Sequence, residues 1–334
     1  MTTSNVSISN ASPSVGIPVT VDNFVRAETD MYFSNLARRC GGVGKFHHNA
    51  RLASGDERLV IRPNRDTLYS VAVFDLDAGP VTITLPDSGG RFMSMQVINQ
   101  DHHIPVPVSY EAGTHKITRE QAETRYVAVA IRLLADPARE SDLDAARRLQ
   151  ALVAVRQAAV GSLELPDWDA ASRASLRERL TALGAGLDSK AMFGRRKEVM
   201  PTRHLIGTAV AWGGNPERDA TYVHVAPEHN DGETVYRLTV GDVPVDGFWS
   251  ITVYAADGYF SRNACEAYSI NSLTAHRAPD GSATIQFGGY DASVPNCLPI
   301  VAGWNYMVRL YRPRAEVLSG EWQFPLAIPR REEF

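Results

Sequence analysis

The chain has 334 residues, of which 44% are hydrophobic and 22% are charged, and its formal net charge is −4. This composition is ordinary for a globular protein with a substantial core in two or three domains, and it excludes general disorder. The slightly acidic balance provides no basic field for nucleic acid or for an anionic membrane, so neither is an expected partner.

Cysteine content and the N-terminal sequence bear on the compartment. Cys40, Cys265 and Cys297 are too few for a disulfide framework, and no metal-binding CxxC spacing occurs. The first 20 residues lack a signal peptide's basic region and apolar core, and no apolar run is long enough to span a membrane. We therefore expect a cytoplasmic protein without disulfides. The sequence leaves the oligomeric state open, and a homo-oligomer is compatible with it.

The N-terminal third begins with a helix and continues with strands. Residues 1–18 are rich in Ser, Asn and Thr, which predicts a disordered arm. Thr20 is expected to cap a helix that extends to about Cys40, before two glycines. Between residues 59 and 131, alternating apolar residues and turn-forming residues predict several short strands.

The densest polar cluster is RPNRDTLYS, from Arg62 to Ser70, which leads into an apolar strand. A proline favours an extended or turn backbone here, and Asn64 and Asp66 suit a turn. Polar side chains at the entrance of a strand often form ligand sites. We therefore expect Asp66 to act as a general acid or base, Tyr69 to donate a hydrogen bond, and Asn64 to bind substrate.

Adjacent histidines occur twice, at 47–48 and 102–103. Neutral imidazoles bind transition metals, but adjacent histidines lack helical ligand spacing. A structural role is the stronger interpretation. His102 and His103 are weak candidates for metal ligands, and no cofactor is expected.

A helical segment is expected in the middle of the chain. Ser141, followed three residues later by Asp144, matches the capping-box pattern of a helix start. A second helix is predicted over residues 170–183, which end before a glycine. The predicted organisation is an arm (1–18), a helix with a β domain (19–135), a helical segment (136–200) and a C-terminal β domain (201–334).

The block that follows contains Arg203, His204 and Trp212, with a Gly-Gly pair after the tryptophan. An arginine can hold a carboxylate with two hydrogen bonds, and a tryptophan can stack on a ligand or close a core. Pocket lining and a structural joint between domains are equally supported. In the first case Arg203 binds an anionic group and His204 transfers protons.

The C-terminal third contains short strands separated by Asp-Gly and Gly-Gly turns, which is typical of a β-sandwich or jelly roll. Trp249 either lines a pocket or packs in the core. Arg309 lies in the apolar strand 307–311 and faces away from Val308 and Leu310. If it is buried, it needs a carboxylate or a ligand as partner, and a structural salt bridge is the stronger interpretation.

Common catalytic motifs are absent from the sequence. GxSxG, HExxH and SxxK do not occur, so an ordinary serine hydrolase or zinc protease is excluded. The stretch 41–46 resembles a phosphate loop but lacks its first glycine and its Ser/Thr. No fingerprint of a redox cofactor is present.

Several segments resemble known families. The segment RPNRDTLYSVAVFDLDAGPVTITLPD, followed by RFMSM, resembles the domain of unknown function 1254. The segments GFWSITVYAADGYF, DGSATIQFGG, NCLPIVAGWNYMVRLYRPRAEVL and GEWQFP resemble the domain of unknown function 1214, and the order of the blocks also fits. The resemblance implies mostly antiparallel β domains with helices between them. It implies no established reaction, although some members carry hydrolase-like names.

Two functions are compatible with these features. The first is an enzyme of hydrolase or lyase type, which acts on a small molecule with acid/base groups in a pocket between the β domains. The second is a non-catalytic protein that binds a small ligand, sugar or peptide. A pocket shared by Asp66 with Arg203 or His204 would favour the enzyme.

Overall fold

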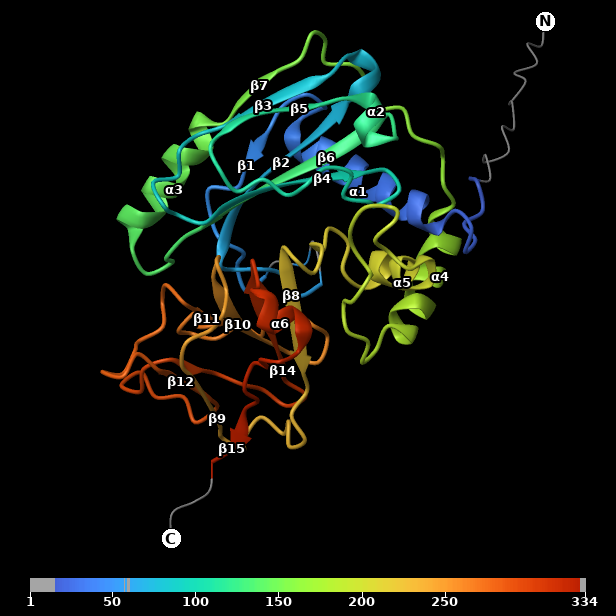
Figure 1. Cartoon of the computed structure of the whole chain (residues 1–334). Coiled ribbons are helices and arrows are strands. Elements are labelled where there is room, and N and C mark those ends of the chain that lie inside the picture. Colours follow the sequence, from blue (N-terminus) through green and yellow to red (C-terminus); the bar gives the residue numbers. More distant parts are fainter. Residues whose placement is uncertain (1–15, 57, 59–60, 331–334) are drawn as a thin grey trace, which may run out of the picture.

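The computed structural model describes residues 16–56, 58 and 61–330 and contains two β units with helices beside the first (Figure 1). The predicted disordered arm lies almost entirely outside the described residues. None of the described helices has the length and apolar character needed to cross a membrane. Cys40, Cys265 and Cys297 are free thiols.

The N-terminal β unit contains two antiparallel sheets. The four-stranded sheet has the order β1 (His47–His48), β2 (Thr67–Asp75), β6 (Tyr126–Leu134), β4 (Met93–Asn99). The three-stranded sheet has the order β5 (Gly113–Ile117), β3 (Val81–Leu85), β7 (Ala154–Arg156). Apolar side chains of β2, β4 and β6 meet those of β3 in one core, which makes this unit a sandwich.

The C-terminal β unit is a second sandwich. One sheet has the order β11 (Ser269–Asn271), β10 (Trp249–Tyr254), β14 (Asn305–Tyr311), β8 (Ala220–Val225). The other has the order β13 (Cys297–Leu298), β12 (Ala283–Phe287), β9 (Tyr236–Val240), β15 (Ile328–Pro329). Only β12 and β13 pair in parallel among the described strands. The predicted mainly-β fold with two antiparallel regions is confirmed.

Helices cover the first unit and connect it to the second. They are α1 (Phe24–Cys40), α2 (Arg119–Ala122), α3 (Glu140–Leu152), α4 (Ala170–Leu183) and α5 (Pro201–Val210), with a 3-10 turn at Leu76–Ala78. The short helix α6 (Ala315–Ser319) follows β14 and packs through Val317 on the core of the second sandwich. One face of α1 packs on the four-stranded sheet through Phe33 and Ala37. Its other side packs against α4 and α5.

Two expected helix starts are placed differently in the structure. The first helix begins at Phe24 with Asn23 as its cap residue, and no side chain caps it. Thr20 does not cap it, and its backbone N–H donates to the Asn23 side chain. The predicted capping box at Ser141 does not form. The helix begins at Glu140, and no side chain caps it.

The two β units meet through an aromatic contact. Phe92 of the first unit lies 4.9 Å from the Phe248 ring and 5.4 Å from the Tyr311 ring of the second. Phe248 and Tyr311 stack at 4.3 Å. This contact fixes the position of β14 relative to β2 and β6, and the candidate site lies beside it.

Candidate functional site

The turn before β2 connects the two β units. The Asn64 Oδ1 atom accepts a hydrogen bond from the Asp66 backbone N–H at 2.7 Å, as in an Asx turn. The Asn64 amide nitrogen donates to the Tyr311 hydroxyl at 2.9 Å and to the Tyr69 hydroxyl at 3.3 Å. One side chain therefore holds tyrosines from both units at the entrance of β2.

The Tyr69 hydroxyl oxygen is surrounded by hydrogen-bond donors. Tyr69 lies opposite Arg132 in the β2–β6 pairing, and Arg132 Nε donates to the hydroxyl at 3.3 Å. Asn64 is a second donor. The Thr67 hydroxyl is a third hydrogen-bond partner. An oxygen that accepts from a guanidinium and an amide is stabilised as an anion, so this environment favours a phenolate.

The electrostatics of Tyr69 agree with this geometry. Burial acts to raise the pKa of its hydroxyl, but the charge and hydrogen bond of Arg132 and the charge of Arg309 outweigh burial and hold the pKa below its usual value. The neighbouring Tyr311 has its pKa raised well above the usual value by burial and by the charge of Tyr69. Tyr69 therefore ionises first. Part of its surface is also accessible to solvent.

Arg309 is buried and bonded to neutral acceptors. Its guanidinium donates to the Thr252 hydroxyl at 2.9 Å, to the Tyr254 hydroxyl at 2.7 Å and to the Arg62 carbonyl at 2.9 Å. The expected salt bridge is not formed with any carboxylate of the described residues. Its positive charge is therefore left to act on nearby titratable groups, among them Asp66 and Tyr69.

Arg132 is also buried and bonded to uncharged acceptors. Its guanidinium donates to Gln96 Oε1 at 2.8 Å and to the Gly213 carbonyl at 3.2 Å, in addition to Tyr69. The side chain is only 6% exposed. Because its other acceptors are uncharged, a phenolate at Tyr69 would be its direct counter-ion.

The pKa of the Asp66 carboxyl is shifted in the opposite direction to that of Tyr69. The residue is fully buried, and its Oδ1 accepts a hydrogen bond from Asn271 Nδ2 at 3.0 Å. Its Oδ2 has no hydrogen-bond partner among the described residues. Burial raises the pKa of this carboxyl, and the charge of Arg309 opposes the rise only in part. Asp66 and Tyr69 thus have pKa values displaced in opposite directions, which is a common property of acid/base pairs.

The predicted His204 and Trp212 lie in a second cluster with His102 and His103. The rings form a stacked column with successive centroid distances of 4.4, 5.6, 5.5 and 4.7 Å, in the order Tyr32, Trp212, His102, His204, His103. Both nitrogens of His204 contact backbone carbonyls at 2.8 Å, those of Met192 and Asp101. Both ring nitrogens of His204 are therefore engaged within the protein.

The two clusters are connected through Gly213. Its backbone N–H donates to His102 Nε2 at 2.8 Å, and its carbonyl accepts from Arg132. The structure therefore places the candidate residues in two groups joined by hydrogen bonds. Within the described part of the chain, no hydrogen bond or ion pair brings His204 or Arg203 to Asp66.

Arg203 and Trp249 lie away from both clusters. Arg203 binds the Asp188 carboxylate and the Lys190 carbonyl on the surface. Trp249 is 2% exposed and packs in the core of the C-terminal sandwich. Their contacts are structural ones.

Arg132 is the main site residue that the sequence analysis missed. It interrupts YVAVAIRLL, a strand that is otherwise apolar. A charged residue in such a strand must find partners when it is buried, and the same reasoning was applied to Arg309. The position of Arg132 in an apolar strand was therefore visible in the sequence. Its partners Gln96 and Gly213 could be identified only from the fold.

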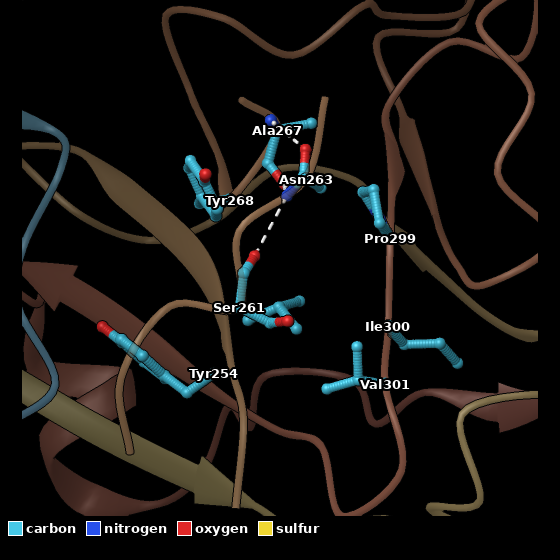
Figure 2. A pocket seen from close by; sticks show the side chains of 9 residues that line it. Tyr254, Ser261, Asn263, Ala267, Tyr268, Pro299, Ile300 and Val301 are labelled. Carbon is cyan, nitrogen blue, oxygen red and sulfur yellow. Dashed lines mark hydrogen bonds between the residues drawn. The ribbon is translucent and has the colours of Figure 1, made fainter. Parts of the chain in front are cut away.

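Two hollows share Tyr268 as a lining residue. A cavity of about 10 Å³, large enough for about one water, is also lined by Tyr254, whose hydroxyl points away from it toward Arg309 (Figure 2). A more open groove of about 520 Å³ lies between Ser54–Asp56 and Arg262–Tyr268. The small cavity therefore places space on the side of Tyr254 away from Arg309.

Metal binding finds no support in the side-chain arrangement. No group of three His, Cys, Asp or Glu side chains within the described ranges is placed to hold a metal ion. Both ring nitrogens of His102 are already bonded, one to Thr208 and one to Gly213. His102 therefore has no free nitrogen to offer as a ligand.

Comparisons with known proteins match two segments of the chain to family models. Residues 43–116 match the model described as protein of unknown function (DUF1254), and residues 220–315 match protein of unknown function (DUF1214). A search of curated proteins gave no match.

Two solved structures are similar to this chain. The crystal structure of the VPA0106 protein from Vibrio parahaemolyticus has a TM-score of 0.72 at 16% identity, covering 93% of this chain and 98% of that one. An uncharacterised protein from Burkholderia cenocepacia has a TM-score of 0.50 at 11% identity, covering 93% and 86%. At these identities the likeness shows the fold alone.

Proposed function

Because the chain belongs to the family that pairs a DUF1254 domain with a DUF1214 domain, and neither description names an activity, we propose a function from the site itself. The protein is an acid/base enzyme of hydrolase or lyase type that acts on a small organic molecule at the boundary of the β units. The supporting observation is the Tyr69 hydroxyl, which accepts hydrogen bonds from Asn64 and Arg132 and lies in the field of two buried arginines.

The residues of this site have distinct roles in the proposal. Tyr69, as a phenolate, removes a proton from the substrate or from a water molecule. Asp66, whose pKa is raised, is the second proton-transfer group. Arg132 and Arg309 stabilise the phenolate and the negative charge that develops on the substrate, as fixed charges do in water-poor sites.

A screen with matched variants tests this proposal. Small esters, lactones and hydroxy acids are incubated with the protein, and the products are followed by NMR. Loss of a general base costs about 10²- to 10⁴-fold in rate, so Tyr69→Phe should lose activity by about that factor. Tyr290→Phe is the control, because Tyr290 is an exposed tyrosine away from the site. A compound that Tyr69→Phe converts as fast as the wild type contradicts the proposal.

The groove of about 520 Å³ favours a second candidate function, which is ligand binding without catalysis. Tyr268 gives the groove an aromatic wall, and aromatic walls suit sugars and other small ligands. On this alternative, a ligand found in the same screen binds wild type and Tyr69→Phe equally and is recovered unchanged.

A further inference from the structure

His102 lies in a conformation that the fold must enforce. Its backbone φ is +57°, in the left-handed region that residues other than glycine rarely adopt, and the residue is fully buried. Its backbone N–H donates to the Asn99 carbonyl at 3.0 Å. Strained residues of this kind cluster at functional sites, where the surrounding structure holds them.

The hydrogen bonds of His102 define its tautomer. Thr208 donates its hydroxyl proton to the His204 carbonyl at 2.8 Å, so its oxygen can only accept from His102 Nδ1 at 2.8 Å. His102 Nε2 accepts from the Gly213 N–H at 2.8 Å. The ring is therefore neutral, with its proton on Nδ1. Burial and the charges of His204 and His103 also lower its pKa well below the usual value.

The turn at Gly213 and Gly214 holds Arg132 by two routes. The Gly213 carbonyl accepts directly from Arg132 at 3.2 Å. The Gly214 carbonyl accepts from Gln96 Nε2 at 2.8 Å, and Gln96 Oε1 in turn accepts from Arg132 at 2.8 Å. The position of this turn therefore sets the orientation of the guanidinium that donates to Tyr69.

We propose that His102 is a positioning residue for Tyr69, acting through the Gly213–Gly214 turn and Arg132. The inference rests on the proposed function, because it concerns the same tyrosine. The His cluster therefore helps to organise the Tyr69 site. His102 Nε2 holds the turn, the turn holds Arg132, and Arg132 orients its hydrogen bond to the Tyr69 hydroxyl. Without this bond the Arg132 side chain loses its aligned contact, and the phenolate loses its strongest donor.

The test follows ionisation of Tyr69 in the full-length protein, using NMR of ¹³C-labelled tyrosine and Tyr69→Phe to assign the signal. His102→Leu removes the acceptor for the Gly213 N–H, and the Tyr69 titration should move to higher pH. His102→Gln retains an acceptor and should move it less. The groups that face the tyrosine, Arg132, Arg309, Tyr222 and Tyr311, stay unchanged in both variants.

Leu180→Ala is the structural control. Leu180 is buried in the apolar cluster that α4 shares with α1 and α5, and it takes no part in the hydrogen bonds of His102, the turn or Arg132. It should lower stability and leave the Tyr69 titration in place. An equal shift in Leu180→Ala and His102→Leu would overturn the positioning role, since the effect would then be general loosening.

The tautomer of His102 can be measured directly in the wild-type protein. Ring ¹⁵N NMR should show His102 with its proton on Nδ1, and a proton on Nε2 would overturn the inference. The two proposals also fail differently. If the wild type has a low-titrating Tyr69 that His102→Leu leaves unchanged, only the positioning role fails. If Tyr69 titrates like an ordinary tyrosine, the positioning role and the proposed function both fail.

Discussion

Asp66 and Tyr69 are three positions apart, yet their surroundings act on their charges in opposite directions. Asp66 is buried with one oxygen unpartnered, which favours the protonated carboxyl. Tyr69 faces Arg132 and accepts hydrogen bonds from it and from Asn64, which favours the phenolate. The difference comes from partners on β6, β11 and β14, which lie far away in sequence. At the scale of single residues, the site is thus a property of long-range pairing.

Substituting Asp66 tests the burial of its carboxyl. The folded pKa is raised, so protonation favours the folded state below the unfolded value of 3.8, and this stabilisation is lost as the pH rises through the folded pKa. Asp66→Asn avoids that loss. Its stability relative to the wild type should increase as the pH rises above 3.8, by about 1–3 kcal/mol, as for other buried polar groups.

Chemical denaturation at a series of pH values measures this difference. Asp291→Asn is the control, because that carboxylate is exposed and its pKa is lowered by bonds to Ser293. A stability difference between wild type and Asp66→Asn that does not change with pH contradicts a raised pKa.

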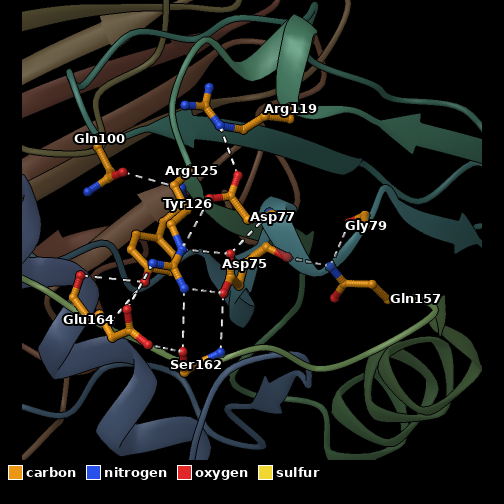
Figure 3. A network of polar contacts seen from close by, with 10 residues as sticks. All are labelled: Asp75, Asp77, Gly79, Gln100, Arg119, Arg125, Tyr126, Gln157, Ser162 and Glu164. Atoms are coloured by element: carbon orange, nitrogen blue, oxygen red, sulfur yellow. Dashed lines mark hydrogen bonds and ion pairs between the residues drawn. The ribbon is translucent and has the colours of Figure 1, made fainter.

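Individual strands are fixed by polar contacts at their ends as well as by their apolar faces. At the end of β2, the Asp75 carboxylate is 2% exposed and accepts hydrogen bonds from Arg125 at 2.9 and 3.1 Å and from two backbone amides (Figure 3). Arg125 also binds Glu164 in the segment before α4. This network connects the end of β2, the residue before β6 and the loop before α4. It lies at the end of β2 away from Tyr69.

Removing Arg125 should weaken this end of the sheet. Arg125→Ala leaves a buried carboxylate with fewer partners, and a loss of about 1–3 kcal/mol in the free energy of unfolding is expected. The matched control is Arg119→Ala, since the Arg119–Asp77 pair is about half exposed on both sides. Exposed pairs contribute about 1 kcal/mol or less. Equal losses in the two variants by urea denaturation would contradict the role given to Asp75.

The strand and turn elements were predictable because their signals are local. Alternation located strands such as β3, and it placed Arg309 on the face of its strand away from Val308 and Leu310, which lie in the core. The start of α3 was not predictable from Ser141, because the cap pattern competes with tertiary bonds. Asp142 instead binds Arg91 and the Asp136 backbone. Local signals thus defined elements, and tertiary contacts decided their ends.

At the scale of the whole molecule, the site exists only because the two β units are held together. Asn64 contributes a turn from the first unit and bonds Tyr311 of the second. Arg309 reaches back to the Arg62 carbonyl. The sequence located Asn64, Asp66, Tyr69 and Arg309 by residue type, but the contribution of Arg132 and the link through Gly213 depend on how the units dock. That docking has no local sequence signal.

The aromatic contact between the units should therefore control their coupling. Phe248→Ala removes a ring that contacts both Phe92 and Tyr311, and a loss of about 3–5 kcal/mol is expected. Hydrogen exchange should show β6 and β14 opening together in the wild type and separately in the variant.

Phe74→Ala is the control for this experiment, because Phe74 is equally buried within the first unit. It should destabilise the protein while β6 and β14 still open together. Joint opening of the two strands in Phe248→Ala would show that the aromatic contact does not couple the units.

The ionisation of Tyr69 tests the central claim most directly. The protein has 12 tyrosines, and ¹³C labelling resolves them in a titration from neutral to alkaline pH. One tyrosine should ionise below the usual value near 10, with a signal that is absent in Tyr69→Phe and moves to higher pH in Arg132→Gln. Identical titrations below pH 10 in wild type and Tyr69→Phe would show that Tyr69 is not the stabilised phenolate.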